Sequence, residues 1–297
     1  MTGGDRPRRA PIPRGTARRA VPGAPMRRTR PVRRASAGLS PVRAGAALVL
    51  LVSAATIYGV ANSSAFVNAS LDIEGAVYTA TEDLEAAVAP AAGVNLFALS
   101  TGPLETRLRE LPTVADASVS VRLPDVLAVR IIEREPILVW ELGVRHYLVD
   151  IDGTLFARLD PDAPPEAAAG LPRISDRRAG SVGLAVGRTL SPVDLDAARR
   201  LASLVPADVG SEADRLDVIV NDASGFILVG RSIGWRAVFG FYTASLRTPE
   251  IIPGQVRLLR SLLVGREQLV ERVILASETD GTYVPRPTPR PTPEPSP

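Results

Sequence analysis

The stretch AGAALVLLVSAATIYGV, residues 44–60, decides the architecture of this chain because it contains no charged residue. The charge-free run is longer still, since the flanking charges are Arg43 on one side and Asp72 on the other. A helix that rises about 1.5 Å per residue needs about 20 mostly apolar residues to cross a hydrocarbon core roughly 30 Å thick. Residues 44–66 supply that length, so the sequence predicts one transmembrane helix there.

Two other interpretations of this stretch fit its flanks less well. A cleaved signal peptide has a short basic leader and a small-residue cleavage site, whereas the basic leader here is 43 residues long. A buried core helix is not expected directly after a basic, Pro-rich segment. A single membrane anchor remains the favoured interpretation.

Positive charge is concentrated ahead of the predicted span. Residues 1–43 hold twelve Arg and one acid, Asp5, whereas the rest of the chain carries a net negative charge. Basic residues beside a span favour the cytoplasmic side of a membrane. The sequence therefore predicts a single-pass plasma-membrane protein whose N-terminus is cytoplasmic and whose later domains are extracytoplasmic.

Residues 1–43 also interleave Arg with Pro and contain few apolar side chains. Burial cannot offset the entropy of ordering such a segment, so we predict a disordered cytoplasmic tail. Its charge suits anionic lipid headgroups. No aromatic residue is interleaved for base stacking, so specific nucleic-acid binding is not expected.

Catalytic chemistry has few candidate residues in this sequence. The chain has no Cys and a single His, His146, which excludes disulfides, thiolate metal sites and paired-His metal sites. Asp150 and Asp152 flank a turn, but the later ligands of an EF-hand calcium loop are missing. We therefore expect an interaction protein with no active site, cofactor, metal or small-molecule substrate.

Residues 69–136 have the pattern of a small α+β unit. Alternating or helical apolar spacing predicts a strand, two helices and two further strands, at about 71–75, 79–89, 101–111, 117–122 and 126–134. Thr79 and Glu82 have the spacing of a capping box at the start of the first helix. Two helices on one face of a three-stranded sheet make a compact domain.

Residues 137–284 read as a second, mixed domain with an antiparallel-rich sheet and two helices. The predicted strands are at about 137–142, 146–149, 154–157, 215–220, 225–229, 234–239 and 270–277, and the helices at about 192–205 and 254–264. Pro recurs closely from residue 285 onward. We expect an exposed, disordered tail at 285–297.

Five short motifs follow one another along the chain: Gly93–Phe97, Leu111–Ala117, Val119–Val129, Glu133–Pro136 and Tyr147–Gly153. This ordered set resembles the bacterial cell-division FtsQ family, which is called DivIB in some lineages. A looser likeness continues through Leu171–Ile174 and Gly234–Gly240. Thr113 stands where the family usually has Trp, and residues 241–253 are longer than the family pattern.

The resemblance implies a fold and a function. Residues 69–136 would be a POTRA domain and residues 137–284 an FtsQ-type β domain. The protein would be a non-enzymatic divisome scaffold that docks FtsB- and FtsL-like partners during septum formation and concentrates at the division septum. Its recruitment strand would include Val119, Val121 and Arg122.

The resemblance also places a docking site near the C-terminal end of the second domain. Residues 270–277 are predicted to be the last strand, and an open strand edge offers unpaired N–H and C=O groups to a partner. The candidate partner-binding residues are Leu275, Ser277, Thr279, Gly281 and Tyr283. An alternative function stays open: a POTRA-bearing transport or secretion component that chaperones polypeptides by strand addition.

Overall fold

The computed structural model describes residues 40–160, 162, 165 and 168–287. Most of both predicted tails, 1–43 and 285–297, therefore lies outside the described residues. The described chain begins with helix α1, Pro41–Ala61, a little ahead of the predicted range 44–66. It is the one described helix that is long and apolar enough to cross a membrane.

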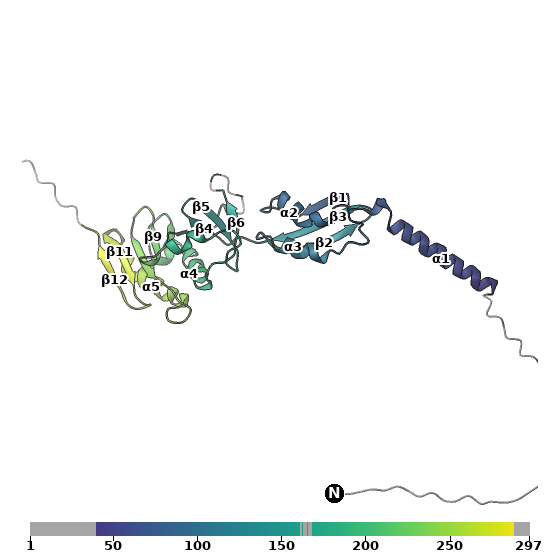
Figure 1. The fold of residues 1–297 in the computed structure, drawn as a ribbon. Coiled ribbons are helices and arrows are strands. Elements are labelled where there is room, and N and C mark those ends of the chain that lie inside the picture. Colours follow the sequence, from purple (N-terminus) through teal and green to yellow (C-terminus); the bar gives the residue numbers. More distant parts are fainter. Residues whose placement is uncertain (1–39, 161, 163–164, 166–167, 288–297) are drawn as a thin grey trace, which may run out of the picture. The chain divides into compact units, whose positions relative to one another are not determined.

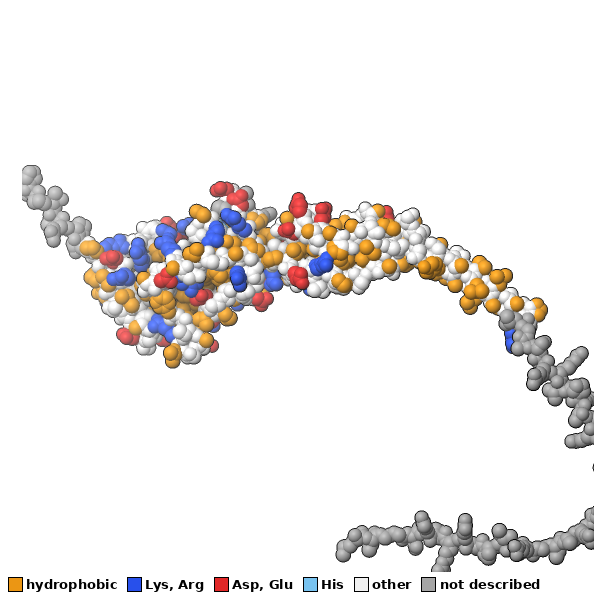
Figure 2. Space-filling model, in the orientation of Figure 1, with side chains coloured by type: hydrophobic (Ala, Val, Ile, Leu, Met, Phe, Trp, Pro, Cys, Tyr) orange, Lys and Arg blue, Asp and Glu red, His pale blue; other side chains and the backbone are white. Residues whose placement is uncertain are grey.

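Helix α1 presents apolar side chains on all sides. None of its residues is buried, and Leu48, Val49 and Leu50 each expose more than half of their surface. Figure 2 shows hydrophobic side chains along the helix. A helix that is apolar all round is stable when lipid or protein surrounds it. The sequence prediction of a membrane-spanning segment agrees with this surface.

The first globular unit has the predicted order of strand, helix, helix, strand and strand, which confirms the predicted α+β class (Figure 1). Its sheet has the order β1-β3-β2, with β1 parallel and β2 antiparallel to the central strand. The elements are β1 Ser70–Glu74, α2 Thr81–Val88, α3 Gly102–Arg109, β2 Val114–Arg122 and β3 Val126–Glu133.

The two helices supply apolar stripes to one core. Leu84 and Val88 of α2 and Leu104 and Leu108 of α3 are buried in a cluster with alternate residues of the sheet. The predicted capping box is wrong, because α2 begins at Thr81 with Ala80 as its N-cap and no side-chain cap. The Thr79 hydroxyl instead forms hydrogen bonds with Glu133 and Thr113.

The second unit is a nine-stranded sheet with two α-helices, and five of its eight strand pairings are antiparallel. The strand order is β12-β11-β10-β9-β8-β7-β4-β5-β6. Its elements are β4 Leu138–Leu142, β5 Arg145–Val149, β6 Leu155–Leu159, β7 Arg173–Asp176, α4 Pro192–Ala202, β8 Leu216–Asn221, β9 Gly225–Gly230, β10 Arg236–Gly240, α5 Ile252–Leu263, β11 Val270–Leu275 and β12 Gly281–Pro285.

Helices α4 and α5 pack on one face of this sheet. Leu195, Leu201, Leu259 and Leu263 from the helices join inward side chains of the strands in one large core, which also holds Trp140 and Trp235. The opposite face of strands β4–β6 forms a smaller cluster around Phe156.

Two strands depart from the sequence prediction. Residues 173–176, for which no strand was predicted, form β7, which joins β4 to β8 with parallel pairings. The expectation that residues 270–277 form the last strand is wrong, because β12 follows and pairs with β11. The outermost strand at this end is therefore β12.

Candidate protein-docking edge

Strand β12 is the last strand at one end of the nine-stranded sheet and has a single neighbour, β11. The antiparallel register places Val273 opposite Tyr283 and Leu275 opposite Gly281. The other edge of β12 has no paired strand among the described residues. Unpaired backbone groups on such an edge can accept an incoming strand.

Backbone alternation decides which residues of β12 point to the open edge. The Asp280 carbonyl accepts from the Ala276 N–H (2.9 Å), and the Arg286 N–H donates to the Leu269 carbonyl (2.7 Å), so both backbones face β11. In an antiparallel ladder, successive residues face opposite sides. The backbones of Gly281, Tyr283 and Pro285 therefore face outward.

Pro285 fits this arrangement because its missing N–H lies on the open side. A Pro on the inward side would remove a ladder bond, whereas an edge strand tolerates Pro where the N–H would face solvent. Gly281 and Tyr283 keep their N–H groups. The free edge thus offers donors along a short segment, and Pro285 ends that segment.

Gly281 and Tyr283 contribute differently to the surface. A Cβ added at Gly281 would lie 3.0 Å from Leu258 Cδ2 of α5, so the helix fits closely against this glycine. Tyr283 remains 41% exposed. An exposed aromatic ring beside a free strand edge is a typical anchor for a partner.

The structure places Ser277 and Thr279 in the turn between β11 and β12. Ser277 Oγ accepts hydrogen bonds from the backbone N–H groups of Thr279 (3.2 Å) and Asp280 (3.0 Å). These residues therefore shape the turn that positions β12. A groove of about 390 Å³ lies beside the turn. Its lining comprises Leu246, Arg247, Ile251, Ala276, Ser277, Glu278 and Thr279.

Leu275 is a core residue, with 1% of its surface exposed. Its carbonyl accepts from Arg247 Nη2 (2.8 Å) and Gln255 Nε2 (3.1 Å). The same two donors reach the Phe239 carbonyl at the end of β10, at 2.6 and 3.2 Å. The Leu275 carbonyl thus ties β11 to Arg247 and Gln255, and its side chain lies in the core.

Sequence reasoning missed Arg247 and Gln255, which join the ends of β10 and β11. Gln255 is fully buried and also accepts from the Tyr242 hydroxyl (2.7 Å). Burial raises the pKa of Tyr242 well above its usual range, although the nearby Arg247 guanidinium acts in the opposite direction, so the hydroxyl keeps its proton. A polar residue on the apolar stripe of α5 was the signal available for Gln255.

The second group of predicted site residues lies on β2, an edge strand of the three-stranded sheet. Val119 is 6% exposed and belongs to the core, and Val121 is partly buried against it. Arg122 is exposed and pairs with Asp72 Oδ2 at 2.8 Å. The two apolar side chains are packing residues, so the surface features of this strand are its backbone edge and Arg122. Strands β2 and β12 belong to different sheets.

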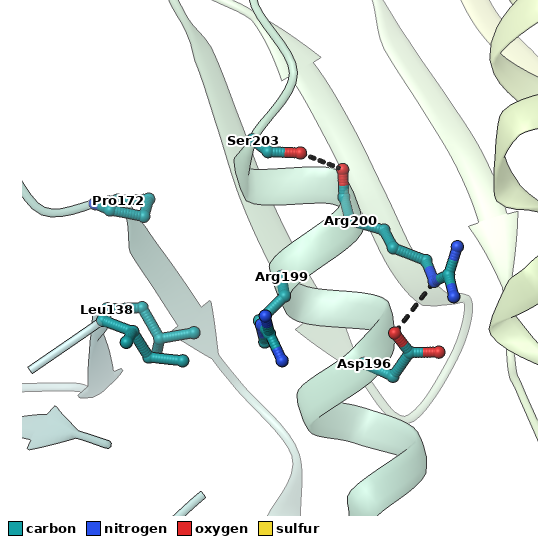
Figure 3. A pocket seen from close by; sticks show the side chains of 7 residues that line it. Leu138, Pro172, Asp196, Arg199, Arg200 and Ser203 are labelled. Atoms are coloured by element: carbon teal, nitrogen blue, oxygen red, sulfur yellow. Dashed lines mark hydrogen bonds and ion pairs between the residues drawn. The ribbon is translucent and has the colours of Figure 1, made fainter. Parts of the chain in front are cut away.

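A groove beside α4 illustrates the other concave surfaces (Figure 3). Asp196 and Arg200 pair with each other there at 2.9 Å, one helical turn apart. Ser203 Oγ donates to the Arg200 carbonyl at 2.9 Å. These polar groups bond to neighbours on the same helix, and the Ser203 hydroxyl donates to a backbone carbonyl.

Comparison with known proteins agrees with the fold. A family model described as a POTRA domain of FtsQ type matches residues 69–134. The cell division protein FtsQ of Chloroflexus aurantiacus is 26% identical over 247 residues, which cover 83% of this chain and 80% of that protein. Streptomyces griseus FtsQ is 30% identical over 164 residues, which cover 52% of this chain and 72% of its own length.

A further relative, FtsQ of Chloroflexus aggregans, is 25% identical over 228 residues, which cover 76% of this chain and 75% of that protein. These matches extend well beyond the POTRA unit into the nine-stranded sheet. Together with the membrane-spanning helix and the POTRA order of elements, they establish that the chain belongs to the FtsQ family of cell division proteins.

Proposed function

We propose that this protein is a non-enzymatic, bitopic scaffold of the bacterial division machinery. Its two globular units lie on the extracytoplasmic side, and its N-terminus lies in the cytoplasm. At the septum, the open edge of β12 binds a strand from an FtsB-like partner, which arrives together with an FtsL-like protein.

The open edge of β12 carries this proposal. The outward backbones of Gly281 and Tyr283 supply hydrogen-bonding groups in a short register, and the ring of Tyr283 supplies apolar area. The adjacent groove at residues 276–279 can receive side chains that flank an incoming strand. Because Pro285 ends the row of donors, indiscriminate pairing along the edge is limited.

The membrane arrangement and the relatives support the same assignment. The Arg-rich segment ahead of α1, together with Arg43 in its first turn, favours a cytoplasmic N-terminus. The relatives are division proteins, which favours this function over a transport or secretion component. Docking at the septum requires no chemistry at the β12 edge beyond strand pairing and apolar contact.

The test is partner binding by the full chain in lipid nanodiscs, with the FtsB- and FtsL-like proteins of the same organism as probes. Tyr283→Pro removes one outward N–H and leaves the ladder to β11 intact. Binding should fall at least tenfold, which corresponds to about 1.4 kcal/mol. Tyr283→Ala should lower binding as well, through loss of the ring.

Thr282→Val is the matched control. Its backbone faces β11 and is unchanged by the substitution, so binding should stay within twofold. Thermal unfolding should be the same for all three variants and the parent. Unchanged affinity in Tyr283→Pro would exclude β12 as the docking strand.

A further inference from the structure

The face of the nine-stranded sheet opposite α4 and α5 carries an unusual row of aliphatic residues on strands β8 to β11. Strand register places Ile219 beside Ile227, Ile227 beside Val238, and Val238 beside Ile274. The buried neighbours of these residues belong to the helix-covered core, so alternation turns the row away from the helices. We call these four residues the aliphatic row.

The aliphatic row departs from the normal pattern of a half-covered sheet. A sheet with one solvated face normally alternates apolar residues inward with polar residues outward. Here Ile219, Ile227 and Val238 are partly exposed and Ile274 is 38% exposed. Helices α4 and α5 pack against the buried residues of these strands, which alternation places on the other face of the sheet. An uncovered aliphatic row across four strands indicates a contact surface.

Arginine side chains border the aliphatic row. Arg236 and Arg272 are direct neighbours on β10 and β11, two residues from Val238 and Ile274 and therefore on the same face of the sheet. Four further Arg residues line a groove of about 410 Å³ that continues the same face toward β7 and also includes Ile219. These four are Arg173, Arg177, Arg215 and Arg231. Figure 2 shows Arg side chains over the strands of this unit.

The acids on this face neutralise part of that charge. Glu141 pairs with Arg173 at 3.1 Å, and Asp217 pairs with both Arg215 (3.1 Å) and Arg231. No described carboxylate lies within ion-pair distance of Arg177, Arg236 or Arg272. Like charges side by side on neighbouring strands are unfavourable, and an anionic occupant would relieve them.

We propose that this face is a second docking surface, which binds an amphipathic helix with an acidic flank from a partner protein. The apolar side of the helix covers the aliphatic row. Its carboxylates pair with Arg236 and Arg272 and with the Arg residues of the groove. Four neighbouring strands span about 14 Å at about 4.8 Å spacing, a length that about ten helical residues cover.

Charge excludes the nearest alternative occupants. Residues 1–39 hold eleven Arg and one Asp, and residues 288–297 hold one Arg and one Glu, so neither terminal segment is acidic. A second copy docked through the same face would bring Arg against Arg. A phosphate polymer would pair with the Arg residues but leave the aliphatic row in water. An acidic amphipathic helix satisfies both features.

The probe is a fluorescent peptide of about 18 residues, five helical turns, with Leu and Ala on one side and Glu on the other. The protein is the full chain in nanodiscs of neutral lipid. The peptide should bind at least tenfold more tightly than a scrambled peptide of the same composition. The double variant Arg236→Glu/Arg272→Glu should weaken binding at least fivefold, and Ile227→Ser should weaken it at least threefold.

The matched control reverses two exposed Arg residues outside this face, Arg257→Glu/Arg266→Glu, and should leave peptide binding within twofold. Thermal unfolding identical to the parent shows that the variants fold. Tyr283→Pro should also leave peptide binding unchanged, which separates this surface from the β12 edge.

Three results would overturn the proposal. The first is equal affinity for the scrambled peptide, and the second is an equal loss of binding in the control double variant. The third is binding of polyphosphate or of phosphatidylglycerol vesicles that depends on Arg236 and Arg272 while the peptide fails to bind, which would assign the face to a polyanion or a lipid surface.

Discussion

Glu133, at the end of β3, accepts hydrogen bonds at one carboxylate oxygen from both the hydroxyl (2.5 Å) and the backbone N–H (2.7 Å) of Thr79. Its carboxylate also accepts from the N–H groups of Val77 and Tyr78. One acidic side chain thus holds three consecutive backbone donors of the loop that leads into α2. The Thr79 hydroxyl, committed to Glu133 and to Thr113, is not available to cap the helix.

Glu133→Ala should destabilise this loop. Each hydrogen bond to a charged group contributes about 1.5–3 kcal/mol, and removal of the carboxylate leaves several donors without their partner. We expect a loss of about 2–3 kcal/mol in the local opening free energy. Faster amide hydrogen exchange at Tyr78 and Thr79 would report it. Glu133→Gln keeps one acceptor oxygen, so its exchange rates should lie between those of the parent and of Glu133→Ala. Unchanged exchange in both variants would contradict the role of Glu133 in holding this loop.

The core of the POTRA unit gives a second prediction. Leu108 of α3 is fully buried in the cluster that contains Val119 and Val129. Leu108→Ala should cost about 2–5 kcal/mol, the sum of lost transfer energy and the cavity left behind. Denaturant unfolding of the full chain measures it. Arg107→Ala, at an exposed position of the same helix, should change stability by less than about 0.5 kcal/mol.

Asp176 gives a prediction about pH. Burial acts to raise its pKa, but hydrogen bonds from Arg178 and Ser181 outweigh burial and hold the pKa of Asp176 below its usual range. The Trp140 indole also donates to this carboxylate at 3.1 Å. A carboxyl group whose pKa is depressed by folding stabilises the fold above its unfolded pKa, which is about 3.9.

The stabilisation from Asp176 should therefore be complete above about pH 4 and be lost as the pH falls through the depressed folded pKa. Asp176→Asn removes the titration, so stability should depend less steeply on pH below about pH 4 than in the parent. Tryptophan fluorescence, sensitive to Trp140, follows unfolding at each pH. Identical pH profiles for parent and variant would contradict this prediction.

The sequence was sufficient to predict elements whose side chains repeat regularly. The charge-free run predicted α1, because all sides of that helix share one apolar surface. Alternation in residues 114–133 predicted β2 and β3, because each of these strands has a buried and an exposed face. Strand β7 was not predicted, because it is short and places a charged residue, Asp176, in the core. There the Asp176 carboxylate pairs with Arg178 and accepts a hydrogen bond from Trp140. Side-chain periodicity cannot reveal a polar residue whose partners come from elsewhere in the chain.

The candidate docking site was predicted only in part for a similar reason. Gly281 and Tyr283 were predicted as site residues, but strand β12, which holds them, was not predicted. A Pro at position 285 argues against a strand unless its missing N–H is known to face the open edge. Leu275 was predicted to contact a partner and instead lies in the core. The supporting pair Arg247 and Gln255 acts on carbonyls of two other strands, which no local pattern indicates.

Membrane topology is directly testable. Reporter fusions after Ser40 and after Arg290 should report opposite compartments, with the first in the cytoplasm, because the Arg-rich segment precedes an uncharged span. Cytoplasmic reporters and export-dependent reporters, used at both positions, give independent readouts. The same compartment at both positions would contradict a single crossing.

The last prediction concerns Arg247, whose guanidinium joins the ends of β10 and β11 next to the turn that leads into β12, the candidate docking strand. Its nitrogens donate to the carbonyls of Phe239 (2.6 Å), Leu275 (2.8 Å) and Ala276 (2.5 Å). Arg247→Ala leaves these acceptors without that partner, at about 1–3 kcal/mol for each buried group. A Lys ammonium is a compact charge and cannot reproduce the planar fork of the guanidinium. Arg247→Lys should therefore recover little of the stability that Arg247→Ala loses.

The expected result is faster hydrogen exchange at Thr282 and Val284, whose backbones face β11, and weaker binding of the FtsB-like partner by at least fivefold. Arg257→Ala, on the exposed side of α5, is the control and should change neither measurement. Loss of partner binding with unchanged exchange would mean that Arg247 contacts the partner directly through the groove at residues 276–279. Unchanged binding together with faster exchange would show that β12 need not be firmly held for docking, and would contradict the positioning role assigned to Arg247.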